Sequence, residues 1–103
     1  MNKYTFNFTC ICPSDKETIS YKAIIETEEM IMVEDINDYI YSLSDKEMFQ
    51  ESLTEKMLME FSITGKSEAA SKFDKWNGHG VKVTTFGTHQ GVEIECELGS
   101  STL

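Results

Sequence analysis

Apolar and polar residues alternate along residues 3–12, which predicts a β-strand with one buried face. The apolar positions are Tyr4, Phe6, Phe8, Cys10 and Cys12. Residues 13–16 then have the composition of a turn, because Pro fixes φ and Ser and Asp bond to the local backbone. Alternation resumes over residues 17–28, so we expect these two strands to form an antiparallel hairpin.

The hydrophobic period becomes that of a helix from residue 33 onward. Apolar residues recur at helical spacing, and carboxylates occupy the first turns, where the helix dipole favours negative charge. The apolar residues are Val33, Ile36, Tyr39, Ile40 and Leu43, and the carboxylates are Glu34, Asp35 and Asp38. The pattern predicts a helix of about eleven residues.

A second helix is predicted to begin at Asp45, because residues 44–47, Ser-Asp-Lys-Glu, form a capping-box sequence. It is expected to run to about Glu60. Its apolar residues are Met48, Phe49, Leu53, Met57, Leu58 and Phe61. Residues 67–76 then allow a short third helix, which the glycine-containing turn of residues 77–80 would end.

A second hairpin is predicted near the end of the chain, with strands over residues 81–87 and 91–98 joined by residues 88–90. The apolar residues expected to face the core are Val81, Val83, Val92, Ile94, Cys96 and Leu98. The element order therefore predicts a single α+β domain over residues 1–98. It would have a four-stranded, mainly antiparallel sheet in the order ββααββ, with two or three helices packed on one face. Residues 99–103 are expected to form a flexible tail.

The charge of the chain is strongly acidic, with a formal net charge of −9 and a pI near 4.5. All nine basic residues are lysines, so the guanidinium fork that commonly reads phosphate is missing. The N-terminal residues lack the continuous apolar segment of a signal peptide, and no segment approaches the roughly 18 apolar residues of a membrane span. We expect a cytoplasmic protein that binds neither nucleic acid nor membranes directly.

The three cysteines, Cys10, Cys12 and Cys96, are an odd number and indicate free thiols in a reducing compartment. Cys10 and Cys12 share a strand face, but a zinc site usually has two to four residues between its cysteine ligands and a second ligand pair elsewhere. We therefore expect three core thiols. His79 and His89 flank a strand whose ends would lie ~25 Å apart, so we expect two separate loop histidines.

No catalytic motif or cofactor motif is predicted in this sequence. Residues 65–67 resemble the end of a phosphate-binding loop, but Glu60 stands where that loop needs its first glycine. The carboxylates lack the spacing of a calcium-binding loop with its central glycine. The sequence therefore predicts no catalytic residue, no cofactor and no metal site.

Two rows of carboxylates are the strongest candidates for a functional surface. Residues 26–60 contain eleven carboxylates and two lysines. The candidate partner-binding residues are Glu47, Glu51 and Glu55 at helical spacing, and Glu93, Glu95 and Glu97 alternating along the last strand. Same-face residues are ~6–7 Å apart in both elements, which is close to the spacing of phosphates along one DNA strand. A carboxylate row can therefore imitate a phosphate row.

These patterns favour a small acidic inhibitor, rather than an enzyme, that binds and blocks a basic nucleic-acid-handling protein by phosphate mimicry. Anti-restriction proteins, anti-CRISPR proteins and immunity proteins against nuclease toxins are of this class. The alternative is a structural or adaptor module that pairs through an exposed strand edge, with its acidic charge serving solubility alone. A third interpretation is an enzyme that uses one isolated carboxylate or histidine.

Overall fold

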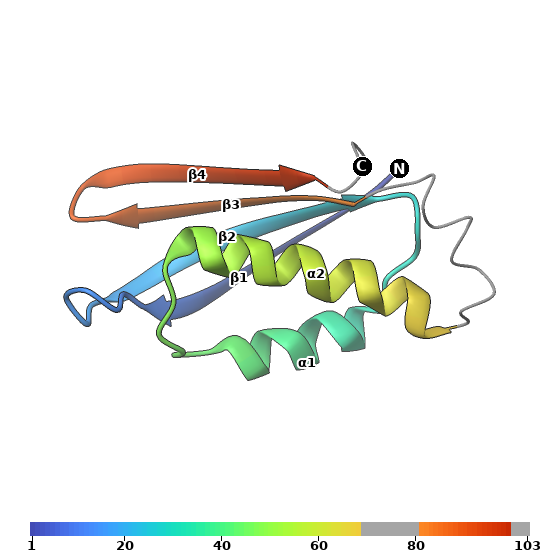
Figure 1. The fold of residues 1–103 in the computed structure, drawn as a ribbon, viewed down its shortest axis with the longest axis horizontal. Coiled ribbons are helices and arrows are strands. Elements are labelled where there is room, and N and C mark those ends of the chain that lie inside the picture. The colour runs from blue at the N-terminus through green and yellow to red at the C-terminus, as the bar shows by residue number, and fades with distance from the viewer. Residues whose placement is uncertain (69–80, 100–103) are drawn as a thin grey trace.

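The fold is an antiparallel sheet with two helices on one of its faces (Figure 1). The computed structural model describes residues 1–68 and 81–99, with the backbone alone described for residues 62–68. The strands and helices of this part of the chain, in order, are β1 (Asn2–Ile11), β2 (Thr18–Thr27), α1 (Val33–Leu43), α2 (Gln50–Glu68), β3 (Val81–His89) and β4 (Val92–Gly99). The predicted α+β architecture with the order ββααββ is confirmed.

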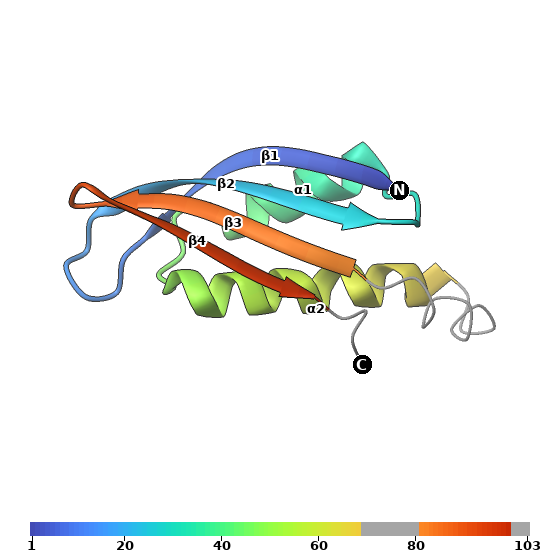
Figure 2. The ribbon, with the colours of Figure 1, turned by 90° about the horizontal axis from the view of Figure 1, so that it is seen from above.

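The strands lie in the sheet in sequence order, β1-β2-β3-β4, and every neighbouring pair is antiparallel. Helix α1 lies against β1, whereas α2 lies against β3 and β4 (Figure 2). The core fills the space between the sheet and the helices, because alternate residues of the strands point toward it. Its fully buried members include Cys10, Ala23 and Ile25 from the first hairpin, Val83 from β3, and Leu53 and Met57 from α2.

Helix α1 spans the residues that the periodicity predicts, and it buries Ile36, Tyr39 and Leu43 against the core. Val33, at its first position, is 62% exposed although it belongs to the predicted apolar set. The helix therefore uses one stripe of three residues to reach the sheet.

Helix α2 begins at Gln50, so the prediction of a start at Asp45 is wrong. Asp45 has a φ of 63°, which a right-handed helix cannot contain. The chain then runs beside the end of β1. The N–H of Ile11 donates to the carbonyl of Lys46 at 2.9 Å, and Ile11 accepts the N–H of Met48 at 3.1 Å. These tertiary hydrogen bonds use the backbone groups that a helix would need, so they override the capping-box signal.

The second hairpin closes through Gln90 and Gly91, so the prediction of a turn over residues 88–90 is wrong in its bounds. Both turn residues are left-handed, with φ of 51° and 81°. A two-residue turn with both φ values positive matches the twist of the flanking strands. His89 is thereby the last residue of β3 rather than a loop residue.

The apolar residues of β4 are less covered than the sequence predicts. Val92, Ile94 and Leu98 remain 58%, 41% and 37% exposed, whereas the other edge strand, β1, buries Phe6, Phe8 and Cys10. Gly99, which the sequence assigns to a tail, still belongs to β4. The rest of that tail and most of the predicted third helix lie outside the described residues. Within the described part, neither helix has both the length and the apolar character that crossing a bilayer requires.

Candidate active site

A thiol, a carboxylate and an imidazole meet at the end of the sheet that carries both hairpin turns (Figure 1). One possible ligand atom from each of Cys12, Asp15 and His89 lies within 4.8 Å of the others. Cys12 directly follows β1, Asp15 belongs to the β1–β2 turn, and His89 ends β3. The register explains their approach, because Tyr21 near the start of β2 pairs with Gly87 near the end of β3. Two segments far apart in the sequence, residues 12–15 and the end of β3, therefore meet at one end of the sheet.

The β1–β2 turn is held by its own backbone. The N–H of Cys12 donates to the carbonyl of Glu17 at 2.8 Å, and the N–H of Lys16 donates to the carbonyl of Cys12 at 2.8 Å. Lys16 has a φ of 65°, the left-handed conformation that reverses the chain here. Asp15 Oδ1 accepts the N–H of Glu17 at 3.1 Å. The turn therefore fixes the position of both Cys12 and Asp15.

Asp15 is the electrostatic centre of the cluster. Its Oδ2 lies 2.7 Å from His89 Nε2 and accepts a hydrogen bond of 2.8 Å from Gln90 Nε2. The backbone N–H of Glu17 is the largest cause that lowers the pKa of Asp15 well below its usual range. Hydrogen bonds from His89, Gln90 and the Cys12 side chain lower it further, while burial opposes them. Asp15 is therefore a carboxylate that orients both the thiol and the imidazole.

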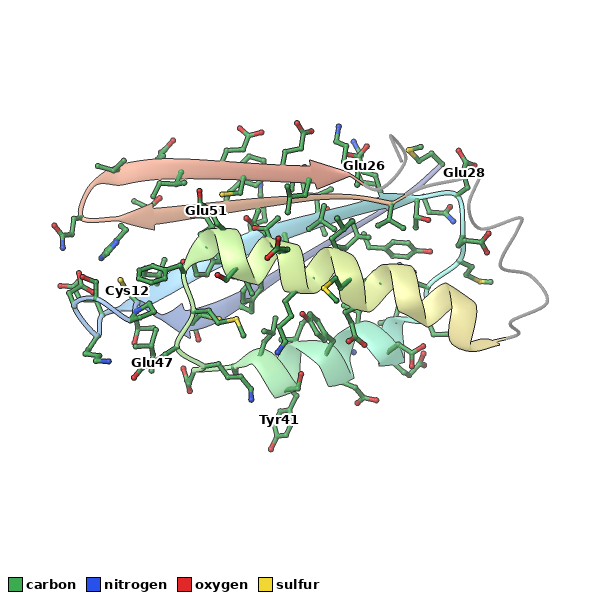
Figure 3. All side chains as sticks on the ribbon, in the orientation of Figure 1. Cys12, Glu26, Glu28, Tyr41, Glu47 and Glu51 are labelled. Carbon is green, nitrogen blue, oxygen red and sulfur yellow. The ribbon has the colours of Figure 1, made fainter. Side chains whose placement is uncertain are left out.

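A pocket of about 100 Å³ lies beside this cluster, and both Cys12 and His89 line it. Ile19 and Tyr21 of the first hairpin form an apolar part of the pocket wall. Gln50, the first residue of α2, lines it as well, so the pocket lies at the N-terminal end of that helix. This end of a helix favours negative charge, including a thiolate. Figure 3 shows Cys12 at the end of the sheet near the two turns.

Gln50 fixes this wall of the pocket to the second hairpin. Its Nε2 donates to the carbonyls of Thr85 at 3.1 Å and Ile94 at 3.0 Å, and it lies 3.1 Å from Thr85 Oγ1. Thr54 Oγ1 donates to the carbonyl of Gln50 at 2.8 Å and lies 2.7 Å from Thr85 Oγ1. Buried side-chain amides held in this way are rigid, so the start of α2 keeps a fixed position over β3 and β4.

The two other cysteines have different surroundings. Cys10 is fully buried, and burial, followed by the charge of Asp45, raises the pKa of its thiol to about 11. Cys96 is partly buried, and burial, followed by the charge of Glu51, raises the pKa of its thiol. All three cysteines are free, and Cys10 and Cys12 are core residues. The prediction that Cys96 is also a core thiol is wrong, because its side chain is only partly buried. Of the three, Cys12 is the one placed beside both an imidazole and a carboxylate.

The first predicted acidic row is divided between two environments. Glu47 lies outside α2, in the segment beside β1, and its carboxylate pairs with Lys16 Nζ at 2.9 Å. Glu51 and Glu55 lie on α2 and are exposed. The three carboxylates therefore do not form the single helical row that the sequence predicts, and Figure 3 shows Glu47 and Glu51 on different segments.

The second acidic row lies on β4, where Glu93, Glu95 and Glu97 are all exposed. Lys82 Nζ lies 2.8 Å from Glu97 and 3.6 Å from Glu26, so part of this surface is neutralised. The hydrogen bond to Glu97 is the largest cause that raises the pKa of Lys82. A role of the two rows in binding a partner stays a prediction.

The cluster at the hairpin turns was not anticipated from the sequence. The predictions that Cys12 is a core thiol and that Asp15 lies in a turn are confirmed. The prediction that His89 is an isolated loop histidine is wrong, because His89 ends β3 and contacts Asp15. His79 lies outside the described residues. The signal was the antiparallel order of the strands, which places the β1–β2 turn and the β3–β4 turn at one end of the sheet.

No protein-family model matches the chain, and no curated protein sequence matches it. Among solved structures, the chain is similar to the archaeosine synthase QueF-Like in its apo form, with a TM-score of 0.78 and 20% sequence identity. The similarity covers 99% of this chain and 94% of that one. This finding corrects the expectation of an anti-CRISPR-type inhibitor or an adaptor that is not an enzyme, because the fold shared over nearly the whole chain is that of a synthase.

Proposed function

We propose that the chain is an enzyme in which Cys12 is the nucleophile and the Asp15–His89 pair is the proton acceptor. The observation that carries the proposal is the approach of these three side chains within 4.8 Å beside a pocket. A nucleophile next to a base, which is in turn oriented by a third group, is the arrangement of covalent catalysis by cysteine. The likeness to a synthase over nearly the whole chain supports the same class of function.

The three residues have distinct roles in this proposal. The pKa of Asp15 is lowered, so Asp15 stays a carboxylate, and its 2.7 Å contact orients the imidazole of His89. We assign His89 as the group that takes the thiol proton. The thiol proton passes to the pair, and the thiolate sulfur of Cys12 attacks an unsaturated, electrophilic carbon of the substrate. A carbon–sulfur bond forms while a π bond of the substrate breaks. The heteroatom that receives those electrons takes the proton back from the pair.

The substrate class that fits best is a small heterocyclic compound related to nucleic-acid bases, rather than a nucleic-acid polymer. The similar structure is an archaeosine synthase, which supports nucleic-acid modification as the area of function. A net charge of −9 opposes the approach of a phosphate backbone. A pocket of about 100 Å³ beside Cys12 accommodates a small reacting group.

Thiol alkylation tests the role of Cys12. The native protein is treated with iodoacetamide in the presence of a metal chelator. Labelling of each cysteine is followed by peptide mass spectrometry. We expect Cys12 to react at least about tenfold faster than Cys96, because reactive thiols lie beside groups that accept their proton. Cys10 and Cys96 serve as controls within the same chain. Equal or slower labelling of Cys12 than of Cys96 would show that it is not an activated nucleophile.

Nucleoside analysis tests the substrate class. RNA, DNA and the small-molecule pool are isolated from cells that produce the wild type, Cys12→Ser or Cys96→Ser, and modified nucleosides and bases are quantified by mass spectrometry. We expect a modified base, archaeosine or a related compound, to accumulate with the wild type and Cys96→Ser but not with Cys12→Ser. Identical profiles from all three would contradict the proposed function.

A further inference from the structure

The cluster at the hairpin turns also has the composition of a metal site. We infer that Cys12, Asp15 and His89 bind Zn²⁺ as three protein ligands, with the fourth coordination position open to the adjoining pocket. A thiolate, an imidazole nitrogen and a carboxylate oxygen are the three donor types that Zn²⁺ takes in proteins. The sulfur donor excludes Ca²⁺ and Mg²⁺ as preferred occupants, because these ions select oxygen.

The distances between the donor atoms are close to those that a tetrahedral ion requires. Metal–ligand bonds of ~2.0–2.3 Å place tetrahedral ligand atoms ~3.3–3.6 Å apart. The donor atoms of Cys12, Asp15 and His89 lie within 4.8 Å of one another, so shifts of about an ångström are sufficient. The side chains of His89 and Asp15 are 24% and 27% exposed, so an ion can reach them from solvent. Their mutual 2.7 Å contact would be replaced by two bonds to the ion.

The groups behind the donors already hold them in place. The N–H of Glu17 and Nε2 of Gln90 both donate to the carboxylate of Asp15. The backbone of Cys12 is fixed by hydrogen bonds to Glu17 and Lys16. Such outer partners orient metal ligands and commonly contribute one to two orders of magnitude to affinity. The pocket lined by Cys12 and His89 supplies space for a water molecule in the open position.

The ion would control the activity proposed for Cys12. A Zn–S bond uses the electron pair with which the sulfur would attack a substrate, so the metal-loaded protein would be unreactive. This consequence rests on the proposed function, whereas metal binding itself does not. The ion displaces the thiol proton to solvent, and no electrons are transferred. Zinc would therefore act as a reversible inhibitor that also protects the thiol from oxidation.

Cobalt titration tests the site through a readout other than activity. Metal-free protein with a non-thiol reductant is titrated with Co²⁺ and then with Zn²⁺. We expect a near-ultraviolet sulfur-to-cobalt charge-transfer band that saturates at one ion per chain and is lost when Zn²⁺ displaces Co²⁺. Cys12→Ser should lack the band, whereas Cys96→Ser should keep it. A wild type without the band, or Cys12→Ser with it, would overturn the inference.

Three further variants separate a three-residue site from a lone thiol. Asp15→Asn and His89→Gln are each expected to weaken Zn²⁺ binding by at least about tenfold, and circular dichroism checks that they remain folded. Gln90→Asn keeps all three ligands but is too short to reach Asp15, so it should weaken binding by about 10- to 100-fold and retain the cobalt band. Unchanged affinity in both Asp15→Asn and His89→Gln would contradict the site.

Labelling by iodoacetamide distinguishes this inference from the proposed function. Fast labelling of metal-free Cys12 with no cobalt band would contradict the metal site and support the role of Cys12 as a nucleophile. A cobalt band with slow labelling of metal-free Cys12 would contradict the role of Cys12 as a nucleophile and support the metal site. If both proposals hold, one equivalent of Zn²⁺ should suppress labelling of Cys12 and leave that of Cys96 unchanged.

Discussion

The ring of Tyr21 occupies the space in which any larger residue at position 87 would place its Cβ. Tyr21 and Gly87 are paired across β2 and β3, and a Cβ built on Gly87 would lie 2.5 Å from Cε1 and 2.6 Å from Cδ1 of the tyrosine. Both residues line the pocket beside Cys12. Glycine at this position therefore permits the ring to lie flat against the strand and to form that wall.

Replacement of Gly87 by alanine is expected to destabilise the fold and to change the pocket. The added methyl group must displace the Tyr21 ring, and overpacking of this kind costs ~1–3 kcal/mol. Urea denaturation followed by circular dichroism measures the loss. Gly99→Ala is the matched control, because the nearest atom to its Cβ would be the carbonyl oxygen of Val81 at an ordinary 3.8 Å. Equal stability of the two variants would contradict this account of Gly87.

Local sequence patterns were sufficient to predict both hairpins, the bounds of α1 and the fold class, because each depends on periodicity and turn chemistry. The start of α2 depends instead on Ile11, which pairs with the segment before the helix. Local spacing cannot reveal a partner so far away along the chain.

Local patterns could not predict the candidate site either, because its residues are also far apart along the chain. Asp15 and His89 are 74 residues apart, and they meet because β2 pairs with both β1 and β3. The sequence predicts two hairpins but does not state that they join through β2 and β3. The order β1-β2-β3-β4 places the two turns at one end of the sheet, and with them Cys12 beside His89.

Removal of the Tyr39 hydroxyl is expected to leave the free energy of unfolding unchanged or to raise it by up to about 1 kcal/mol. This hydroxyl is buried and has no hydrogen-bond partner among the described residues. Burial, followed by the charge of Glu60, raises the pKa of Tyr39, so the hydroxyl stays protonated. Tyr39→Phe keeps the edge-on contact of the ring with Phe61 at 5.3 Å. Urea denaturation provides the measurement.

Tyr4→Phe is the comparison for this prediction, because the Tyr4 hydroxyl accepts the N–H of Ile31 at 2.9 Å. Its removal leaves that partly buried N–H without this partner and should cost about 1 kcal/mol. The same chemical change is thus expected to have opposite consequences at Tyr4 and Tyr39. A large loss of stability in Tyr39→Phe would show that its hydroxyl does have a partner.

The contribution of Asp15 to stability is expected to depend on pH. Its pKa is lowered in the folded protein, chiefly by the N–H of Glu17, so the carboxylate stabilises the fold at neutral pH. This contribution is complete above the unfolded pKa of about 3.9 and declines as the pH falls below it toward the folded value. The stability difference between the wild type and Asp15→Asn should therefore shrink on acidification. Urea denaturation at a series of pH values measures it.

Asp38→Asn removes one exposed carboxylate from α1 and serves as the charge-matched control for Asp15→Asn. A difference between Asp15→Asn and the wild type that stays constant from neutral to acidic pH would contradict the proposed electrostatic role. The same result would weaken the view that Asp15 orients His89 as a carboxylate.

Charge reversal in the first acidic row should distinguish its members. Glu51→Lys and Glu55→Lys change exposed residues of α2 and are expected to alter stability by no more than about 0.5 kcal/mol each. Glu47→Lys also breaks the ion pair with Lys16 and places two cations together, adding a cost of about 0.2–1 kcal/mol. Thermal denaturation at low and high salt measures this difference, which should diminish as salt screens it. Equal effects at all three positions would contradict the separation seen in the structure.

Replacement of Gln50 by leucine is expected to destabilise the fold by about 2–4 kcal/mol, the largest loss among these variants. The change removes two buried hydrogen bonds from Nε2 to Thr85 and a partly buried one to the carbonyl of Ile94, and each such bond contributes about 0.5–1.5 kcal/mol. Because Gln50 connects α2 to both strands of the second hairpin, its loss should also increase hydrogen exchange of β4 amides and alter the labelling rate of Cys12. Ser52→Ala, on the exposed side of the same helical turn, is the control and should change neither property. Wild-type stability and unchanged exchange in Gln50→Leu would show that packing alone holds α2 at the pocket.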